Sequence, residues 1–549
     1  MISAPEKILE QLDPDQQAIV KAIRGPVCVI AGAGTGKTRV ITHRIAYAIS
    51  AGVTDSTKVL ALTFTSRAAG EMRTRLRTLG FTGVAARTFH SAALKQLLYF
   101  WPQVLGGQFP NLLTSKTGFL SKAIERANVP VPAQPNNLKE VANEIEWAKV
   151  LQISPLDYLE YSEKYQRQPQ FSFKKSNSEN LGLVSKIYES YESLKHQERA
   201  IDFEDVLLLT VGMLEEDRQT RERVRDQYRY FTVDEYQDVS PLQQRLLDLW
   251  LGNRQEICVV GDSAQTIYSF AGATSSFLEN FPKKYQNAQI FYLSRGYRST
   301  PEIIHVANRI FSQNEVKENP QLHSAGSHGD KPEVKGFSDA KQEAEYVVSS
   351  VTKLIGQGIN PNQIAILART NSQIDLIQTA FNKANLPTQL KTSERFFERV
   401  EVKDAIRQIR QASVLPSEIN DWLADLRAVL LPFGDADFVL ALLNLAQELK
   451  ENEPNSSLRT FLRELTDRAE QNNPPTLPGI TLSTLHSAKG LEWPHIYLIG
   501  VSAGILPMGN DLAEERRLFY VGVTRAAKHL VITYSGEKSE FLADSLSIN

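Results

Sequence analysis

Two short segments carry residue types that could bind and hydrolyse a nucleoside triphosphate. The first, AGAGTGKT at Ala31–Thr38, follows an apolar run and opens a helical pattern. Its three glycines would let backbone N–H groups close around phosphate oxygens, as phosphate-binding loops do. Lys37 could reach the β- and γ-phosphates, and the Thr38 hydroxyl could ligate Mg²⁺. The strict motif begins with glycine rather than Ala31, which leaves a plain glycine-rich turn as the alternative.

The second segment, FTVDEYQD at Phe231–Asp238, places two acids at the end of an apolar run. Asp234 could hold Mg²⁺ through water, and Glu235 could take a proton from the attacking water. Adjacent acids after a strand are more often a solvated turn. Their combination with the phosphate loop nevertheless predicts a nucleoside triphosphatase. This combination does not indicate which process the energy of hydrolysis drives.

Bulk composition excludes some classes and leaves others open. The 549 residues are too many for one core and suggest three to four domains. The net charge of −2 does not indicate a nucleic-acid binder, so any DNA site must be a local basic and aromatic groove. Cys28 and Cys258 lie in apolar runs and predict buried thiols in a reducing compartment. With no leader pattern and no apolar run of membrane length, we expect a cytoplasmic protein.

Strand and helix patterns alternate in two regions of the chain, which predicts βαβ units and parallel sheets. Ligands of such sheets bind at the carboxyl ends of the strands. The predicted strands are Val27–Ile30, Lys58–Thr63, Tyr230–Val233 and Ile257–Val260 in the first region, and Ile364–Ala368, Gly479–Ser483 and His495–Ile499 in the second. Residues 96–199 are mostly helical. Residues 413–477 predict three short helices, around Glu418–Leu431, Asp437–Leu449 and Ser457–Gln471, before a linker at Asn472–Pro478.

Further segments follow one another in a fixed order along nearly the whole chain. They are LDPDQQAIV (12–20), ALTFTSRAAGEMRTR (61–75), RTFHS (87–91), IDFEDVL (201–207), VVGDSAQTIYSFAGA (259–273), LSRGYRS (293–299), FFERVEVKDAI (396–406), TLHSAKGLEWP (484–494) and EERRLFYVGVTRA (514–526). Together with the two segments above, this series resembles the superfamily 1A DNA helicases of the UvrD/Rep/PcrA type.

The resemblance implies an α/β fold of two RecA-like P-loop domains with parallel sheets, each interrupted by a mainly helical insert. The implied domains are a first core domain at 1–95 and 200–293, its insert at 96–199, a second core domain at 294–412 and 478–549, and a short insert at 413–477. The second insert is shorter than the family's, and the chain ends soon after Leu542. We therefore expect a trimmed motor without the family's autoinhibitory arm and tail.

The resemblance also implies an ATP site between the two core domains. Gln265 would sense the γ-phosphate, while Arg298 and Arg525 would act as arginine fingers. Tyr297 would stack on the adenine. The implied catalytic residues are thus Glu235, Gln265, Arg298 and Arg525, and the implied metal ligands are Thr38 and Asp234. The implied ATP-binding residues are Gln16, Ala31, Gly32, Ala33, Gly34, Thr35, Gly36, Lys37, Thr38, Arg39, Tyr297 and Glu492.

A DNA track that ignores sequence needs stacking surfaces and phosphate contacts, because every base has a π-face. By family position, the candidates are Thr63, Phe64, Thr65, Thr88, His90, Tyr268 and Phe270. For two further groups of residues, the sequence leaves two interpretations open, contact with DNA and an ordinary place on the protein surface. They are Arg67, Arg73 and Arg77 at helical spacing, and the aromatic and basic group Phe171, Phe173, Lys174 and Lys175.

Four residues depart from the family pattern: Ala264 stands where an acid is usual, Phe270 for Trp, Ala271 for Arg and Gly296 for Asn. They leave the charged residues that ATP hydrolysis requires unchanged, and we expect them to weaken DNA binding. The predicted function is an ATP- and Mg²⁺-dependent DNA helicase moving 3′ to 5′ in repair or replication. The alternative is a single-strand translocase, or the motor subunit of a repair or phage-defence complex. A catalytically dead DNA-binding scaffold is disfavoured because the catalytic side chains are present.

Overall fold

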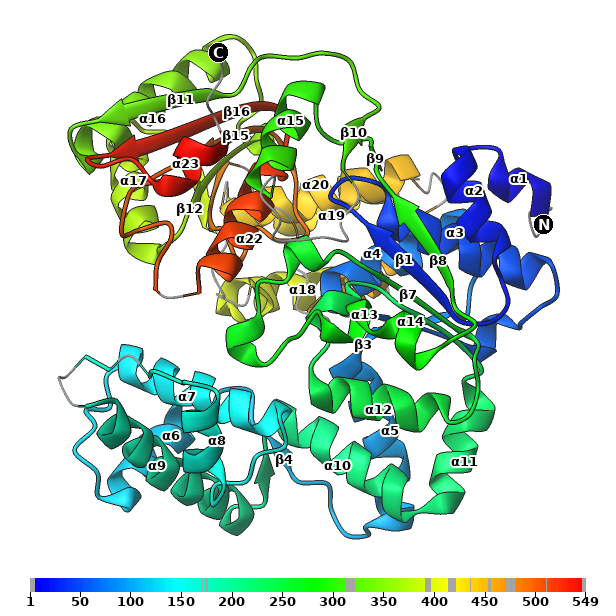
Figure 1. The fold of residues 1–549 in the computed structure, drawn as a ribbon. Coiled ribbons are helices and arrows are strands. Elements are labelled where there is room, and N and C mark those ends of the chain that lie inside the picture. The colour runs from blue at the N-terminus through cyan, green and yellow to red at the C-terminus, as the bar shows by residue number, and fades with distance from the viewer. Residues whose placement is uncertain are drawn as a thin grey trace. The chain divides into compact units, whose positions relative to one another are not determined.

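The computed structural model describes most of the chain as two compact units, each with one six-stranded sheet (Figure 1). The described residues are 5–169, 171–172, 176–311, 321–390, 396–412, 421–434, 436–452, 456–470, 475, 479–509 and 511–545. The first unit comprises Met1–Ala31, Lys37–Phe64 and Met72–Leu293, and the second comprises Gly32–Gly36, Thr65–Glu71 and Ser294–Asn549. No helix among the described residues is long and apolar enough to cross a membrane.

The first sheet is entirely parallel, with strand order β3-β2-β6-β7-β1-β8. Its strands are β1 (Val27–Ala31), β2 (Val59–Thr63), β3 (Ala85–Thr88), β6 (Tyr230–Val233), β7 (Ile257–Gly261) and β8 (Gln289–Leu293). The four central strands are buried along their whole length. Strands of a parallel sheet covered on both faces have this continuous apolar pattern. The predicted strands of this region are confirmed to within one residue at each end.

Helices cover both faces of the first sheet, because successive side chains of a strand point to opposite sides. In β1, Cys28 and Ile30 pack with α5, α10 and α12, whereas Val27 and Val29 pack with α2, α3 and α4. The helices are α1 (Pro5–Leu9), α2 (Pro14–Lys21), α3 (Lys37–Ser50), α4 (Ser66–Thr78), α5 (Phe89–Val104), α10 (Phe203–Glu216), α11 (Arg218–Gln227), α12 (Pro241–Leu251), α13 (Ser276–Glu279) and α14 (Phe281–Lys284). Cys28 and Cys258 are buried free thiols, as predicted.

The first helical insert has an apolar core of its own. Its helices are α6 (Thr117–Ala127), α7 (Pro135–Val150), α8 (Tyr158–Lys164) and α9 (Asn177–Gln197), and the short strands β4 (Asn111–Leu112) and β5 (Ala200–Ile201) pair beside them. Trp147 and Tyr158 pack edge to face at the centre of this core, with Leu181 and Ile187 of α9 beside them. Ser176 and Glu179 form a capping box that starts α9.

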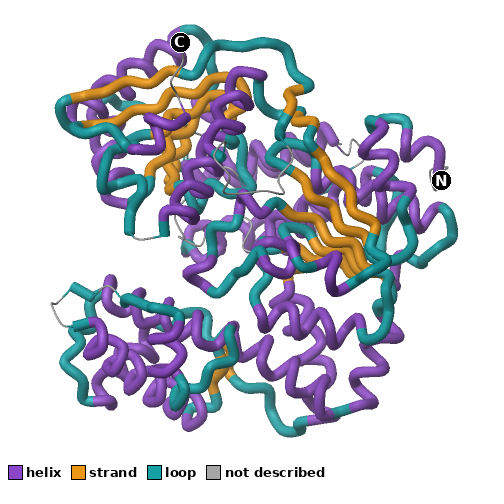
Figure 2. The backbone as a smooth tube through the Cα atoms, in the orientation of Figure 1, coloured by secondary structure: helices purple, strands orange, loops and turns teal. Residues whose placement is uncertain are grey.

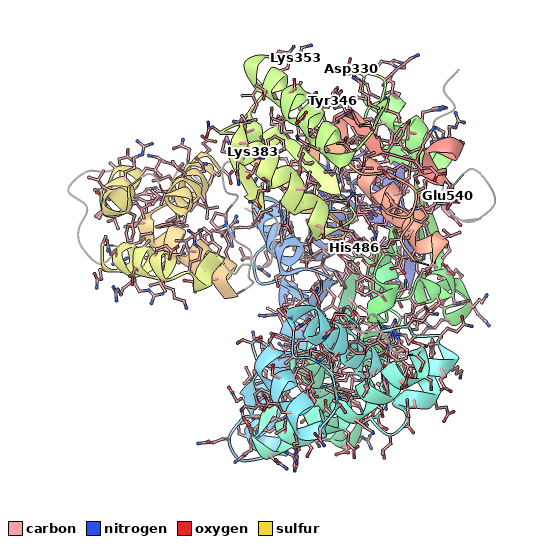
Figure 3. The ribbon with its side chains drawn as sticks, turned by 90° about the vertical axis from the view of Figure 1, so that its left-hand side faces the viewer. Asp330, Tyr346, Lys353, Lys383, His486 and Glu540 are labelled. Carbon is pink, nitrogen blue, oxygen red and sulfur yellow. The ribbon has the colours of Figure 1, made fainter. Side chains whose placement is uncertain are left out.

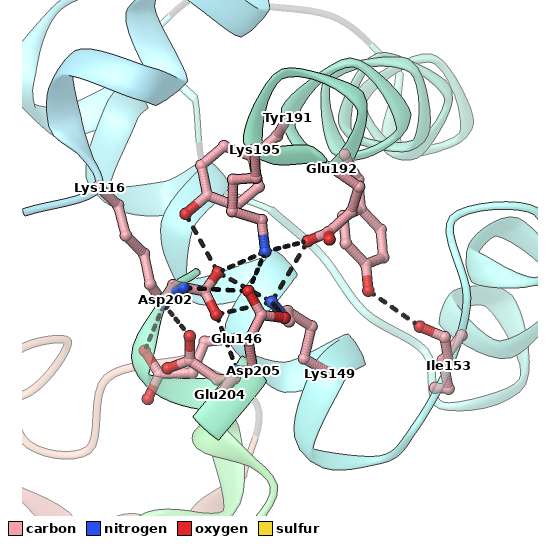
Figure 4. Close-up of polar contacts among 11 residues, drawn as sticks. Lys116, Glu146, Lys149, Ile153, Tyr191, Glu192, Lys195, Asp202, Glu204 and Asp205 are labelled. Atoms are coloured by element: carbon pink, nitrogen blue, oxygen red, sulfur yellow. Dashed lines mark hydrogen bonds and ion pairs between the residues drawn. The ribbon is translucent and has the colours of Figure 1, made fainter. Parts of the chain in front are cut away.

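A buried cluster of charges joins this insert to the start of α10 (Figure 4). The Lys149 ammonium of α7 lies 2.7 Å from Asp202, 2.5 Å from Asp205 and 3.3 Å from Glu192. Lys195 of α9 contacts the same three carboxylates at 3.1, 2.5 and 2.9 Å. Asp202 and Asp205 also form the capping box of α10. Three carboxylates this close could hold a metal ion, but two ammonium groups already supply the positive charge.

The ionisation of this cluster follows from its burial and its charges. Burial alone would raise the pKa of Asp202, but the ammonium groups of Lys149, Lys195 and Lys116 hold that pKa well below its usual range. Burial alone would lower the pKa of Lys149, but Asp202 and Asp205 raise it well above its usual value. Both partners therefore stay charged, and removing either one leaves buried charge that the rest of the cluster compensates only in part.

The second unit also contains a parallel six-stranded sheet, in the order β11-β16-β15-β12-β14-β13 (Figure 2). Its strands are β11 (Glu333–Phe337), β12 (Ile364–Ala368), β13 (Thr388–Leu390), β14 (Ile480–Thr484), β15 (Trp493–Leu498) and β16 (Ala526–Ser535), and a separate pair is β9 (Arg295–Gly296) with β10 (His323–Ser324). The prediction placed Ile364–Ala368 correctly, Gly479–Ser483 one residue early, and His495–Ile499 within two residues.

Four helices of the second unit pack on its sheet, and one more packs on the first of these. The four are α15 (Pro301–Ile310), α16 (Ala340–Gly356), α17 (Asn371–Lys383) and α22 (Leu512–Val523), and α23 (Glu540–Ser545) packs on α15. Val347 and Val351 of α16 and Ile377 of α17 lie in the core, whereas Lys353 and Lys383 of the same helices are exposed (Figure 3). This division between faces is the amphipathic pattern expected of a helix that covers a sheet.

Four helices form a second, separate apolar core. They are α18 (Val400–Ala412), α19 (Trp422–Leu430), α20 (Asp437–Asn452) and α21 (Leu458–Glu470). The three predicted helices occur here within the described residues. Val402 and Ile409 place α18 in this core too, although α18 precedes the predicted boundary at residue 413. Residues 413–420 and the predicted linker Asn472–Pro478, apart from Pro475, lie outside the described residues.

The buried cluster predicts a stability difference that depends on pH. Replacing Lys149 by Met should destabilise the first insert by about 3–5 kcal/mol at pH 7, because Lys195 is then the one ammonium group in contact with all three carboxylates, which leaves buried negative charge in excess. Asp202 has a depressed pKa in the folded state, so the Lys149 contribution is present above about pH 4 and is lost as the carboxylates become protonated below it. Hydrogen exchange of α9 at pH 7 and at lower pH measures this difference.

The matched control is Lys122→Met, which removes an exposed ion pair to Glu198. That pair should contribute less than about 1 kcal/mol at either pH. Equal effects of the two substitutions, or a Lys149 effect that does not change with pH, would contradict the account of the cluster.

Candidate functional site

The segment Ala31–Thr38 forms the connection from the end of β1 to the start of α3. Gly34 and Gly36 have φ values of 73° and 86°, a left-handed backbone that L residues rarely adopt. The Thr35 hydroxyl donates to the Gly32 carbonyl at 2.9 Å, and Lys37 Nζ donates to the Ala31 carbonyl at 3.3 Å. The loop therefore presents backbone N–H groups at the N-terminus of a 14-residue helix, where the helix dipole favours an anion.

Asp234 and Glu235 follow β6 directly. Thr38 Oγ1 lies 3.4 Å from Asp234 Oδ2, so the first turn of α3 meets the first acid. Burial, together with the charge of Glu235, raises the pKa of Asp234 to about 7. Glu235 has a φ of 52°, an unusual left-handed conformation for a residue with a side chain. Strained backbone of this kind is concentrated at functional sites.

Two residues that the sequence analysis did not single out connect Glu235 to Gln265. Gln237 Nε2 donates to Glu235 Oε2 at 2.5 Å, and Gln237 Oε1 accepts from the Asp262 N–H at 2.9 Å. Asp262 Oδ2 then accepts from Gln265 Nε2 at 2.6 Å. Gln237 and Asp262 lie inside the motif segments quoted above, each beside a predicted catalytic residue. Their polar side chains at these positions were the sequence evidence that could have identified them.

The oxygen atoms at this site suit a divalent cation of the magnesium type. The Thr38 hydroxyl and the Asp234 carboxylate are hard oxygen ligands, which Mg²⁺ prefers. A nearby cation would favour the ionised form of Asp234, whose raised pKa shows that ionisation is otherwise costly. The residues present therefore fit the predicted metal role.

Gln16 and Arg39 both belong to the first unit. Gln16 is buried on α2, and its N–H donates to the capping carboxylate of Asp13 at 2.9 Å. Arg39, in the first turn of α3, donates to the Gln11 carbonyl at 2.5 Å. Arg39 thus ties the segment that carries Gln16 to the helix that follows the loop. The contact of Gln16 with adenine stays a prediction.

The second unit brings Arg298, Arg525 and Glu492 together around Thr524. Arg298 forms an ion pair with Glu492, and its Nη1 donates to the Thr524 carbonyl at 3.1 Å. Arg525 is only 2% exposed and donates to the Thr524 hydroxyl at 3.1 Å and to the Val521 carbonyl at 2.9 Å. Both arginines thus donate to Thr524, Arg298 to its carbonyl and Arg525 to its hydroxyl.

Gly32–Gly36 belongs to the same compact unit as these arginines. The Tyr297 N–H donates to the Gly34 carbonyl at 2.9 Å, which brings the segment LSRGYRS beside the glycine-rich loop. A Cβ atom on Gly34 would come 2.9 Å from the Arg298 Cβ, so this position requires glycine for space as well as for its backbone angle. The Tyr297 side chain is half-exposed beside Arg295. Its stacking on adenine stays a prediction.

Among the predicted DNA-contact residues, three aromatic side chains gather in the first unit. Phe64 and Tyr268 stack with ring centroids 5.1 Å apart and planes 20° apart. Phe270 lies 6.2 Å from Tyr268 and is exposed. Thr63, just before Phe64, is buried at the end of β2. Together Phe64, Tyr268 and Phe270 form an aromatic surface of the kind on which bases stack.

The remaining DNA candidates begin helices. Thr65 Oγ1 accepts from the Ala68 N–H, and Thr88 caps α5 by accepting from the Ser91 N–H, both at 3.1 Å. Each hydroxyl proton remains able to donate to a phosphate oxygen. His90 lies two residues after Thr88, where it contacts Phe203 edge to face, and burial lowers its pKa, which favours the neutral ring.

The structure gives contacts for one residue from each of the two groups whose role the sequence left open. Arg73 donates to the Ala86 carbonyl at 2.5 Å, and Phe171 packs against the core of the first insert. Both contacts support structural roles. Phe173, Lys174 and Lys175 lie outside the described residues.

A glycine-rich loop between a buried strand and a helix, with a lysine, a hydroxyl and two acids around it, defines a P-loop nucleoside triphosphatase. Residues 12–286 match the family model of the UvrD/REP helicase N-terminal domain, and residues 291–413 and 436–537 match the UvrD-like helicase C-terminal domain. The chain therefore belongs to the UvrD/REP helicase family. The predicted fold of two RecA-like domains is confirmed.

Relatives of this family align over almost the whole chain. The ATP-dependent DNA helicase UvrD2 of Mycobacterium tuberculosis is 39% identical over 98% of this chain and 81% of its own length. The ATP-dependent DNA helicase PcrA of Staphylococcus epidermidis is 26% identical over 96% of this chain and 83% of its own. PcrA of Staphylococcus aureus is 27% identical over 97% and 84%.

The raised pKa of Asp234 predicts how pH affects stability without nucleotide. Its folded pKa lies above the ordinary value, so its ionisation costs stability as pH rises from about 4 to 7. In EDTA at pH 8, Asp234→Asn should therefore be more stable than wild type, by on the order of 1–3 kcal/mol. The two proteins should converge near pH 4. Urea unfolding followed by circular dichroism makes the comparison.

Asp226→Asn is the matched control because Asp226 pairs with Arg229 at the surface. This exchange should change stability little at either pH. The account of Asp234 would be wrong if its asparagine variant were less stable than wild type at pH 8.

Proposed function

We propose that this protein is an ATP-dependent DNA helicase that translocates 3′ to 5′ along single-stranded DNA and unwinds duplex. The observation that carries the proposal is the hydrogen-bonded series Glu235–Gln237–Asp262–Gln265, which leads from the acid pair into the segment that bears Tyr268 and Phe270. Family membership supports the same conclusion, because its relatives are named as ATP-dependent DNA helicases.

In the proposed mechanism, the backbone of the phosphate loop and Lys37 hold the β- and γ-phosphates. Glu235 accepts a proton from the attacking water, and Gln237 fixes its carboxylate. Arg298 and Arg525 stabilise the negative charge that develops on the γ-phosphate. Mg²⁺, held near Thr38 and Asp234, would neutralise charge on the phosphate oxygens when bound.

Hydrolysis can drive movement because the γ-phosphate sensor and the DNA surface share one short segment. Gln265 ends the turn η3 (Ser263–Gln265), and Tyr268 lies three residues later, just before the turn η4 (Ser269–Ala271). Tyr268 in turn stacks on Phe64. A change in the Gln265 contacts on phosphate release would therefore displace the aromatic surface that holds the bases.

A second candidate is a translocase that strips proteins from single strands, or the motor subunit of a repair or phage-defence complex, with little unwinding of its own. The pair Phe270–Ala271 favours it, because Ala271 offers no cation to the DNA backbone where the family usually has arginine. We further propose a cytoplasmic role in DNA repair or replication. A protein partner from one of these pathways fits either function.

The function is tested by ATPase rate with and without single-stranded DNA. Wild type should be stimulated by DNA, and Lys37→Ala should lose at least about 100-fold of its activity, because the group that holds the β- and γ-phosphates is removed. Lys122→Ala, an exposed lysine on α6, is the matched control and should behave like wild type. Phe64→Ala should need about tenfold more DNA for half-maximal stimulation, since one stacking surface is lost.

Strand separation then distinguishes the two candidates. Duplexes with a 3′ or a 5′ single-stranded tail are compared with wild-type protein. Unwinding from the 3′ tail supports the helicase, and a preference for the 5′ tail overturns the polarity. DNA-stimulated ATPase without strand separation identifies the translocase, whereas an ATPase that DNA does not stimulate excludes both.

A further inference from the structure

The first insert contacts the aromatic surface at the turn η4, which bears Phe270. Helix α7 of the insert packs against this turn, and a Cβ atom on Gly272 would come 2.5 Å from Val150 Cγ2. Gly272 has a φ of 87°, so this position requires glycine both for its backbone angle and for space. The end of the turn therefore lies against the insert with no room for a side chain between them.

One arginine of the insert adds polar contacts to this packing. Arg167 Nη1 donates to the Phe270 carbonyl at 3.2 Å, although the two residues are 103 positions apart in the sequence. Arg167 Nη2 donates to Glu144 Oε1 at 2.6 Å, and Nε donates to Glu144 Oε2 at 3.2 Å. All three guanidinium nitrogens are thus engaged, two by a carboxylate of α7 and one by the backbone of η4.

The core of the insert holds the Arg167 side chain in this place. Its guanidinium lies over the Trp147 ring, 4.7 Å from the centroid, in cation–π geometry. The Glu144 side chain is 3% exposed and also accepts from the Tyr158 hydroxyl at 2.8 Å. Trp147 and Tyr158 belong to the apolar core of the insert. The nitrogen that meets Phe270 is therefore preorganised, and little entropy is lost when it forms its hydrogen bond.

The direction of the Phe270 ring depends on the backbone that Arg167 contacts. Phe270 is 44% exposed, and its ring lies 6.2 Å from that of Tyr268 at an angle of 60°. Side chains occupy a few staggered rotamers relative to their backbone, so an exposed ring follows the orientation of its own peptide unit. A hydrogen bond that fixes the Phe270 carbonyl therefore also restricts where this ring stands beside Tyr268.

We propose that Arg167 is a positioning residue for DNA binding, which holds the Phe270 ring in the orientation that stacks on a base. This inference rests on the proposed function, because it requires Phe270 to contact DNA. It also gives the first insert a part in movement. The turn η4 begins four residues after Gln265, so the segment that would shift with the γ-phosphate sensor is tied to the insert through Arg167.

The substitution Arg167→Lys separates this role from support of the insert. A lysine keeps the positive charge that Glu144 requires, but its single nitrogen cannot reproduce contacts that occupy three nitrogens of arginine. Binding of a fluorescent single-stranded oligothymidylate is measured by anisotropy without ATP. It should weaken about fivefold to tenfold, which is within the range for loss of one base stack. Hydrogen exchange of α9 should match wild type, since the core of the insert is unchanged.

A double-mutant cycle tests whether Arg167 acts through the Phe270 ring. Phe270→Ala removes the ring, so adding Arg167→Lys to it should weaken binding further by less than about twofold. A general loosening of the insert would instead weaken binding by the same factor with and without the ring. The cycle therefore distinguishes a positioning role from a merely structural one.

The matched control is Arg126→Lys, because Arg126 is an exposed arginine of the same insert that donates to Gln197 and Ser193 of α9. This variant should bind DNA like wild type. Three results would each overturn the inference alone: equal binding by wild type and Arg167→Lys, an equal further loss in the Phe270→Ala background, and an equal loss with Arg126→Lys. Failure of the wild-type protein to bind single-stranded DNA would overturn the proposed function and this inference with it.

Discussion

The parallel pairing of β1, β6 and β7 is the constraint on which the candidate site depends. Because all strands of this sheet run in one direction, their carboxyl ends open at one edge. The phosphate loop leaves β1 there, Asp234 leaves β6, and Asp262 begins the turn after β7. The same crowding buries Asp234 and raises its pKa, so the site stores an electrostatic cost that a cation nearby would offset. The shared direction of the strands therefore both brings these residues together and accounts for the raised pKa of Asp234.

Much of the fold could be predicted from the sequence because it depends on local patterns. Strands buried on both faces, such as Ile257–Gly261, are continuous apolar runs, and the phosphate loop has fixed glycine positions. The packing of α18 against α19, α20 and α21 was not predicted. Helical periodicity identifies a helix and its apolar face, but it does not identify the partner against which that face packs.

Contacts between distant residues could not be predicted. Lys149 and Asp202 are 53 residues apart, and their ion pair follows from how α7 and α9 pack against α10. The roles of Gln237 and Asp262 likewise require two strand ends to be neighbours in space. In each case, the residue types indicated polar side chains, but they did not identify the residues with which these side chains pair.

The account depends most on the claim that the ends of β6 and β7 act as one unit in catalysis. A double-mutant cycle measures this as the maximal ATP hydrolysis rates, without DNA, of Gln237→Ala, Gln265→Ala and the variant with both changes. Residues joined through Asp262 should show strongly non-additive losses, with the double variant little slower than the worse single one. Losses that multiply independently would contradict the claim that one hydrogen-bonded series links the acid pair to Gln265, the proposed γ-phosphate sensor.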